Sequence, residues 1–312
     1  TAGVPNNSIS QNIGTQRNQG LEFNLSGDIY STKNFRWGFF ANFTTVQNEI
    51  TSLYSIGEQA IDFIPNGNYN LIKVGESINV IHGLRWAGVN TSNGNPMYFN
   101  AKNELIQHNT SGNNAYYFAD NKDAPVDLTR PTSLTFNDRA ILGKAIPTWF
   151  GGFGNNFRYK NFDLDFLFRF SGGNNIMNIT RQEILLNQQF QNNGTEIMDR
   201  WTSAGQVTDV PRLRSGNGNN INQNGLAVSR FVESGNFIRL QNVTLGYNFD
   251  GSMLSTGTNG FISGVRIFVQ GQNLWMSSKY SGADPENASE AGLDAAVSPQ
   301  VMILSGGLKV SF

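Results

Sequence analysis

The sequence predicts an all-β protein whose fold is an antiparallel transmembrane β-barrel. Apolar and polar residues alternate with a period of two in segments of about ten residues, the length that a tilted strand needs to cross a hydrocarbon layer. Charged residues gather on one face of these segments. Short turns also alternate with long connections, an asymmetry typical of such barrels.

The segment 161–172 shows the alternation most clearly. Its apolar face consists of Phe162, Leu164, Phe166, Phe168 and Phe170, and its polar face of Asp163, Asp165, Leu167 and Arg169. A cation at the midplane of the lipid-facing side of a barrel costs about 2–4 kcal/mol, so a membrane barrel requires this separation of charge.

We expect about nine strands, at residues 19–30, 35–48, 71–89, 96–106, 148–159, 161–172, 235–249, 262–274 and 300–312. The alternation breaks in the seventh, where Arg239 shares parity with Val243 and Leu245, and a β-bulge near Gln241 or Asn242 restores the phase. Residues that fall on the wrong face in other strands are His82, Phe40, Ile81 and Phe268.

The predicted connections differ strongly in length. Residues 31–34 and the pair Lys160–Asn161 are tight turns, whereas residues 103–147, 172–234 and 275–300 form long excursions. Structureless loops of that size are unusual in compact soluble domains. We expect these loops to be extracellular, with short helices in the second of them, where Ile184, Leu185, Ile197, Met198 and Trp201 have helical spacing.

The number of strands predicts that the chain is a portion of a larger barrel. Nine is odd, whereas bacterial single-chain barrels have even numbers of strands. We therefore expect residues 19–312 to form the C-terminal portion of a barrel and residues 1–18 to be an irregular lead-in, a loop or the end of an earlier strand.

Composition excludes several classes of function. The chain has 312 residues, a net charge of −1 and no Cys, so neither a basic field for nucleic acid nor a thiolate metal site or disulfide is expected. His82 and His108 are the only histidines, and no nucleophile or metal cluster accompanies them in the sequence, so both are expected at a surface or lipid interface. We expect no catalysis, metal site or cofactor.

Several segments, in order along nearly the whole chain, resemble motifs of the SusC/RagA class of TonB-dependent transporters. The motifs are NxGxE, DR-x-ILG-x-x-x-P-x-x-x-GG, FDLS, RWT…PR, SR-x-x-E-x-GSFLRLKNITLGY and GQNL…TKYSGxDPE. Each motif is weak by itself, and the ordered set is strong. The matching residues are 18–22, 138–153, 161–164, 200–212, 229–247 and 271–286.

The resemblance implies a 22-stranded barrel in the outer membrane of a Gram-negative bacterium, spanning it many times. It also implies an N-terminal plug and a TonB-contacting segment, neither of which is in this sequence, and a SusD-like surface lipoprotein as partner. The implied function is TonB-dependent import of oligosaccharides or peptides, and the sequence does not distinguish these substrates. Membrane lipid and the barrel-assembly machinery are further expected partners, and Phe312 resembles the terminal assembly signal.

Candidate binding residues lie on the polar strand face and in the loops. Side chains for substrate are Tyr116, Tyr117, Trp201, Asp163, Asp165 and Arg169, and side chains for a partner or loop contact are Trp275, Tyr280, Asp284 and Glu286. The two aspartates suit acid–base work in principle, but solvated wall charges are the favoured interpretation. Trp275 and Tyr280 fit sugar stacking and a membrane-interface belt equally well. Residues 284–294 are interpreted as a solvated acidic loop in preference to a calcium site.

Two other functions remain open at this point. One is a structural or adhesive outer-membrane barrel without transport. The other is a soluble β-rich glycan-binding module, because alternation by itself does not distinguish a membrane barrel from a sheet with one wet face.

Overall fold

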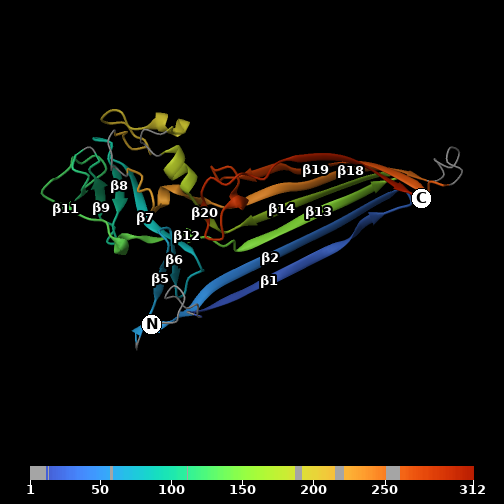
Figure 1. Ribbon diagram of the computed structural model, residues 1–312, viewed down its shortest axis with the longest axis horizontal. Helices are drawn as coiled ribbons and strands as arrows, with labels where there is room; N and C mark the ends of the chain where they lie inside the picture. The colour runs from blue at the N-terminus through green and yellow to red at the C-terminus, as the bar shows by residue number, and fades with distance from the viewer. Residues whose placement is uncertain are drawn as a thin grey trace, which may run out of the picture.

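A computed structural model describes residues 12, 14–56, 59–110, 112–186, 192–214, 221–250 and 261–312. It contains two parts, a long antiparallel sheet and a domain at one end of it (Figure 1). The long sheet has seven strands in the order β1-β2-β13-β14-β18-β19-β21. Their bounds are β1 Gly14–Ser31, β2 Phe35–Leu53, β13 Trp149–Tyr159, β14 Phe162–Gly172, β18 Phe237–Asp250, β19 Gly264–Ser278 and β21 Ile303–Ser311.

The second part, here called the loop domain, comprises the described residues of 54–147, 174–236 and 279–302. Its strands are β3 Ser55–Ile56, β4 Gln59–Ala60, β5 Phe63–Asn66, β6 Asn70–Lys73, β7 Val80–Val89, β8 Pro96–Phe99, β9 Leu105–His108, β10 Tyr116–Phe118, β11 Pro131–Thr132, β12 Ala140–Lys144, β15 Asn175–Asn178, β16 Ala227–Val228, β17 Val232–Ser234 and β20 Leu293–Asp294. Its helical turns are η2 Phe136–Asp138, η3 Thr180–Leu185, η4 Thr195–Asp199, η5 Ser229–Phe231 and η6 Pro285–Asn287.

The long sheet confirms the predicted fold class and seven of the nine predicted strands. The other two segments are also strands, but they lie elsewhere: residues 71–89 contain β6 and β7, and residues 96–106 contain β8 and part of β9, all in the nine-stranded sheet of the loop domain. β7 is covered on both faces, with Val80, Ile81 and Leu84 at most 2% exposed. Burial on both faces shows that β7 is a core strand and not part of a lipid-facing wall.

The predicted irregularity in the seventh strand is confirmed. The register of β18 shifts between Leu240 and Asn242 against both of its neighbours, which leaves Gln241 as the extra residue of a bulge. After the shift Arg239 lies opposite Arg169 on the polar face, while Val243 lies opposite Phe166 on the apolar face.

The start of β1 corrects the predicted lead-in. The strand begins at Gly14, so residues 14–18 are extended and paired with β2 and are not irregular. Residues 1–11 and 13 lie outside the described residues. By alternation, the charged residues Arg17 and Glu49 fall on the same face as Leu21 and Thr45. They lie beyond the last pairing of β2 with β13, and they form an ion pair of 2.6 Å with each other.

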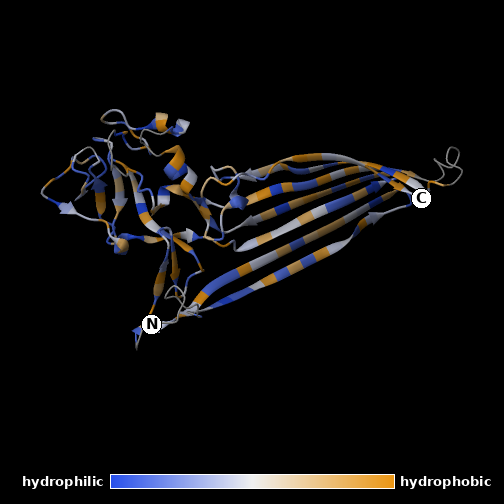
Figure 2. Cartoon of the chain, viewed as in Figure 1, coloured by the Kyte–Doolittle hydropathy of each residue, from blue (hydrophilic) through white to orange (hydrophobic). Residues whose placement is uncertain are grey.

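The apolar face of the long sheet is open, which is the arrangement that a membrane wall requires. Hydropathy alternates along each strand in Figure 2. Leu25 is 67%, Phe162 50% and Leu304 70% exposed, so these side chains are not covered by a second layer. A soluble sandwich would bury such a face against another sheet.

The loop domain corrects the expectation that the long connections are loops whose regular structure is limited to short helices. All three contribute strands, and side chains from distant segments form one buried core. This core consists of Ile81, Leu84, Tyr98, Met177, Leu186, Val210, Ala227, Val228 and Phe231. The helical character predicted after Gly173 is confirmed as two short turns, η3 and η4, although Ile184, Leu185 and Met198 are exposed and not buried.

No helix among the described residues combines the length and apolar character needed to cross a membrane.

Candidate functional site: the polar wall beneath the loop domain

The polar face of the long sheet carries paired charges. Asp28 accepts from Arg36 Nε at 2.9 Å. Asp163 forms an ion pair with Arg266 and accepts from Asn248 Nδ2 at 2.6 Å. The prediction of solvated wall charges is therefore wrong for Asp163, which is mostly covered and has partners on β18 and on the strand beyond it, β19. Asp165, next on the same face, lies opposite Asn156 and Thr244.

Two arginines face each other across β14 and β18 near the loop domain. Arg169 and Arg239 are direct cross-strand partners, an arrangement that repulsion disfavours. The segment after β19 folds back and supplies two carboxylates. Arg239 Nη2 donates to both carboxylate oxygens of Asp284, at 2.7 and 2.8 Å, and Glu286 forms ion pairs with Arg239, at 3.2 Å, and with Arg169. These four residues are called the arginine–carboxylate cluster.

The cluster corrects the interpretation of residues 284–294 as a solvated acidic loop. Asp284 is 4% exposed and accepts from Arg239, and its Oδ1 also caps η6 by accepting from the Glu286 amide at 3.0 Å. Asp294 is 7% exposed and accepts from the hydroxyls of Tyr280 and Thr180. These carboxylates anchor the segment to the sheet and to the loop domain, and they do not project into solvent.

Tyr280 is buried, contrary to the expectation of an exposed aromatic. Its side chain is 7% exposed and its hydroxyl donates to Asp294. Burial, together with that hydrogen bond to a carboxylate, raises the pKa of Tyr280. Trp275, by contrast, is 51% exposed and lies opposite Leu240 on the apolar face. Its position therefore favours the belt interpretation over sugar stacking.

The predicted aromatic residues for substrate stacking have protein partners already. Tyr117 is 4% exposed, which excludes it as a stacking surface in this structure. Tyr116 stacks on His108, with ring centroids 4.5 Å apart, and its hydroxyl accepts from Gln223 Nε2 at 2.7 Å. The indole N–H of Trp201 donates to the Thr91 carbonyl at 3.0 Å, with the Arg212 guanidinium 5.4 Å from its ring. These three side chains hold loops together.

Phe312 follows the end of β21 and is 78% exposed. Its ring lies 5.3 Å from that of Phe261, which precedes β19. The exposed position at the strand end is compatible with the expected assembly signal, which stays a prediction.

A buried network of ion pairs holds the loop domain together, and several of its residues belong to the motifs that resemble those of the SusC/RagA class. Arg230 has a side chain 2% exposed and bonds Asp209 at 2.8 Å and Glu196 at 3.2 Å. Arg181 bonds Glu196 at 2.6 Å and Glu233 at 3.3 Å. The network joins residues that are far apart in sequence, so it fixes the loop domain as one body.

The two histidines are buried, which corrects their expected place at a surface or lipid interface. His82 is 6% exposed and packs on Phe136, with ring centroids 4.9 Å apart; His108 is 3% exposed and its Nε2 lies 2.8 Å from Asn114 Oδ1. Burial is the main reason why the pKa of each ring lies below its usual value of 6.5.

The buried histidines predict that the loop domain loses stability in mild acid. The unfolded chain binds protons at these rings as pH falls through about 6.5 and the folded chain does not, so stability is full above that value and declines below it. We expect the denaturant midpoint, followed by tryptophan fluorescence, to be lower at pH 5.5 than at pH 7.5. A variant with both His82→Gln and His108→Gln should lose most of this difference, and an unchanged difference would contradict the assignment.

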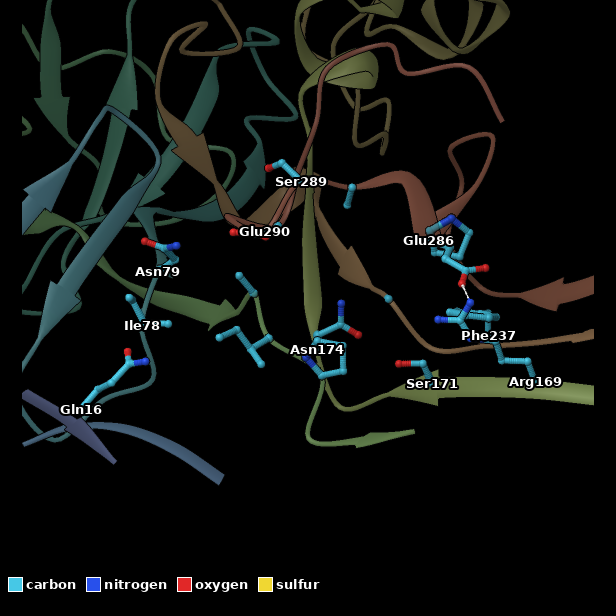
Figure 3. Close-up of a pocket in the computed structure, with 17 residues that line it drawn as sticks. Gln16, Ile78, Asn79, Arg169, Ser171, Asn174, Phe237, Glu286, Ser289 and Glu290 are labelled. Atoms are coloured by element: carbon cyan, nitrogen blue, oxygen red, sulfur yellow. Dashed lines mark ion pairs between the residues drawn. The ribbon is translucent and has the colours of Figure 1, made fainter. Parts of the chain in front are cut away.

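Two cavities lie along the polar side of the sheet. The first, of about 560 Å³, lies where the loop domain meets the sheet, and Figure 3 shows Arg169, Ser171, Asn174 and Glu286 around it. The second, of about 380 Å³, is a hollow on the sheet itself, bordered by Phe150 and several polar side chains. Arg169 lines both, so the two cavities are neighbours along one polar path.

Sequence reasoning missed two features of this wall. Arg239 is buried, with a side chain 4% exposed, and its signal in the sequence was the break in alternation that placed it out of phase. Phe150 lies on the polar face, opposite Thr44 and Ser171, and is 43% exposed there. Alternation along residues 148–159 places Phe150 on the polar face, and this position was the signal in the sequence.

No family model matches the chain. TonB-dependent receptor P3 of Formosa agariphila is 30% identical over 317 aligned residues, covering 97% of this chain and 29% of the relative. TonB-dependent receptor SusC of Bacteroides thetaiotaomicron is 28% identical over 323 aligned residues, covering 98% and 27%. A solved structure of the RagAB peptide transporter superposes with a TM-score of 0.71 at 25% identity, covering 97% of this chain and 30% of the other.

The chain spans less than one third of the length of these curated relatives, while nearly all of it matches them. Sequence and fold agree, because the same resemblance appears in receptor sequences and in a solved transporter. This chain is therefore a SusC/RagA-type segment that corresponds to somewhat less than one third of a TonB-dependent receptor.

Proposed function

We propose that the protein to which this chain belongs imports oligosaccharides or peptides across an outer membrane by TonB-dependent transport, with this chain forming part of the barrel wall and the extracellular loops. TonB-dependent receptors of the SusC/RagA type are outer-membrane β-barrel proteins of Gram-negative bacteria, and nutrient import is their shared role. Catalysis forms no part of the proposal, because the named relatives are receptors and transporters.

The observation that carries the proposal is the separation of the two faces of the long sheet. Exposed apolar side chains cover one face, and charges such as Asp163, Arg169 and Arg266 lie on the other. Lipid is the medium that suits the first face, and water in a wide lumen suits the second. The loop domain lies at one end of the sheet, where an external substrate would enter (Figure 1).

The proposal includes three kinds of partner besides membrane lipid. A SusD-like surface lipoprotein would lie over the loop domain, where Met198 and Val207 are 72% and 87% exposed. The TonB complex would act through a part of the receptor that this sequence does not include. The barrel-assembly machinery would recognise the strand that ends near Phe312.

A transport assay tests the proposal. Cells in which the gene is deleted should lose uptake of the cargo, restored by the intact gene but not when TonB is also inactivated. Uptake that persists without TonB would contradict TonB-dependent import. A receptor that assembles in the membrane and carries no cargo would favour the structural or adhesive alternative.

A further inference from the structure

The hollow on the polar face of the long sheet has an unusual set of side chains. Phe150 is 43% exposed there, although the surrounding face is polar. Glu22, Asn24, Asn42 and Gln241 border the same hollow. Phe40, on the same face of β2 and 39% exposed, is a second aromatic ring near Asn42, so this part of the polar face combines exposed rings with amide groups.

Two amide side chains in the hollow lack, among the described residues, the cross-strand hydrogen bonds that several other amides of the sheet make. Across neighbouring strands Asn48 Nδ2 donates to Asn18 at 2.6 Å, and Gln270 Nε2 donates to Asn242 at 2.7 Å. Within the described part of the chain, the side chains of Asn24 and Asn42 have no such partner, and both are exposed. Their hydrogen-bonding groups are available to a ligand.

A glycine gives the hollow its depth. Gly152 lies between Asn42 and Arg169 in the register of β2, β13 and β14. A Cβ at this position would lie 2.9 Å from the Phe168 carbonyl oxygen, which is too close. Because residue 152 has no side chain, the backbone forms the base of the hollow beside the Phe150 ring.

We propose that this hollow is a binding subsite for a neutral sugar unit, with the Phe150 ring against the apolar face of the sugar and the amides of Asn24 and Asn42 at its hydroxyl groups. This inference rests on the proposed import function and names the substrate class at one place on the wall. Hydroxyl groups both donate and accept, as amides do, so the two chemistries match. The first cavity adjoins the hollow at Arg169, and it accommodates further sugar units of the same oligosaccharide.

Charge and strand pairing favour a neutral sugar over other ligands. The guanidinium of Arg169 is engaged by Glu286, and Glu22 adds a negative charge at the rim, so an anionic ligand gains little. Extended peptides commonly bind by adding a strand to a free sheet edge. The Phe150 ring lies on β13, and β13 and its neighbours β2 and β14 are each paired on both sides in the described sheet, so no free edge lies beside this ring.

Binding to the complete receptor, purified in detergent, tests the subsite. The probes are maltotriose, laminaritriose and xylotriose as neutral sugars, trigalacturonate as a charged sugar, and tetra-alanine as a peptide, measured by calorimetry. We expect a neutral trisaccharide to bind, and Phe150→Ala to weaken it about tenfold, which corresponds to about 1.4 kcal/mol. Asn42→Ala should also weaken the binding of the same sugar.

Matched controls come from the same sheet. Phe162→Ala removes a similarly exposed ring from the opposite face, and Asn34→Ala removes an amide at the turn between β1 and β2; neither should change the affinity. Affinities independent of Phe150 across the whole panel would overturn the subsite, as would Phe150-dependent binding of tetra-alanine or trigalacturonate alone. If Phe150→Ala lowers the stability of the receptor but leaves its affinity for the sugar unchanged, the ring serves internal packing, and this result too overturns the subsite.

The same variants separate this inference from the proposed function. TonB-dependent uptake that is unaffected by Phe150→Ala would remove the subsite and leave import standing. Phe150-dependent sugar binding in a receptor that imports nothing would support the subsite and remove the import function.

Discussion

Phe166→Lys should largely abolish assembly of the barrel in the membrane. Phe166 lies in the middle of β14 on the apolar face, opposite Asn155 and Val243, with the rings of Phe157 and Phe168 each 6.0 Å away. A lysine there would put an ammonium group at the depth of the hydrocarbon, at a cost of about 2–4 kcal/mol. Resistance of the folded barrel to unfolding in detergent, seen as a heat-modifiable band in a gel, measures this loss.

Asp165→Lys is the matched control for Phe166→Lys. It introduces the same side chain one residue away, on the face that carries Asp163 and Arg266. The lysine would meet water and polar groups, so the folded band should remain near its normal intensity. Equal loss for the two variants would remove the support for the assignment of faces.

Asp284→Asn should release the segment between β19 and β21 from the sheet. The Asp284 side chain is 3% exposed and receives both hydrogen bonds from Arg239, whose side chain is 4% exposed. Neutralising Asp284 leaves Glu286 to compensate both arginines of the cluster, and removing one partner of a buried pair costs about 3–5 kcal/mol. We expect cleavage within residues 279–302 by a protease to become much faster.

Asp120→Asn serves as the control for this variant. Asp120 pairs with Arg130 at 2.6 Å, but the side chains are 76% and 43% exposed. An exposed pair contributes less than about 1 kcal/mol, so proteolysis should hardly change. If both variants give the same rate, or neither exceeds the normal rate, the arginine–carboxylate cluster does not hold the segment.

The sequence predicted the wall of the sheet more accurately than the loop domain, and the reason is physical. Side chains in a strand alternate regardless of what covers each face, so residues such as Phe166 and Arg169 were assigned to opposite faces correctly. Even the bulge at Gln241 followed from this rule. The alternation does not say which medium covers a face, and β7 therefore resembled a wall strand although protein covers it on both sides.

The candidate site was harder to predict because burial of a side chain depends on contacts between distant segments. Tyr280 and Asp294 are 14 residues apart and bond each other, and Thr180 reaches Asp294 across 114 residues. Residue type alone suggested exposed aromatics and solvated acids at these positions. Arg239 and Phe150 were visible as departures from alternation, but their roles required the register of neighbouring strands.

The way in which the loop domain is inserted has an evolutionary consequence. β2 and β13 are adjacent, and so are β14 and β18, although much of the loop domain lies between the members of each pair in sequence. The entropy of closing a loop grows only slowly with its length, by about 0.6 kcal/mol per doubling, so insertions between paired strands are cheap. A lineage can thus enlarge or exchange its loop domain while the register of the long sheet stays the same, which separates change in the loops from the demands of membrane insertion.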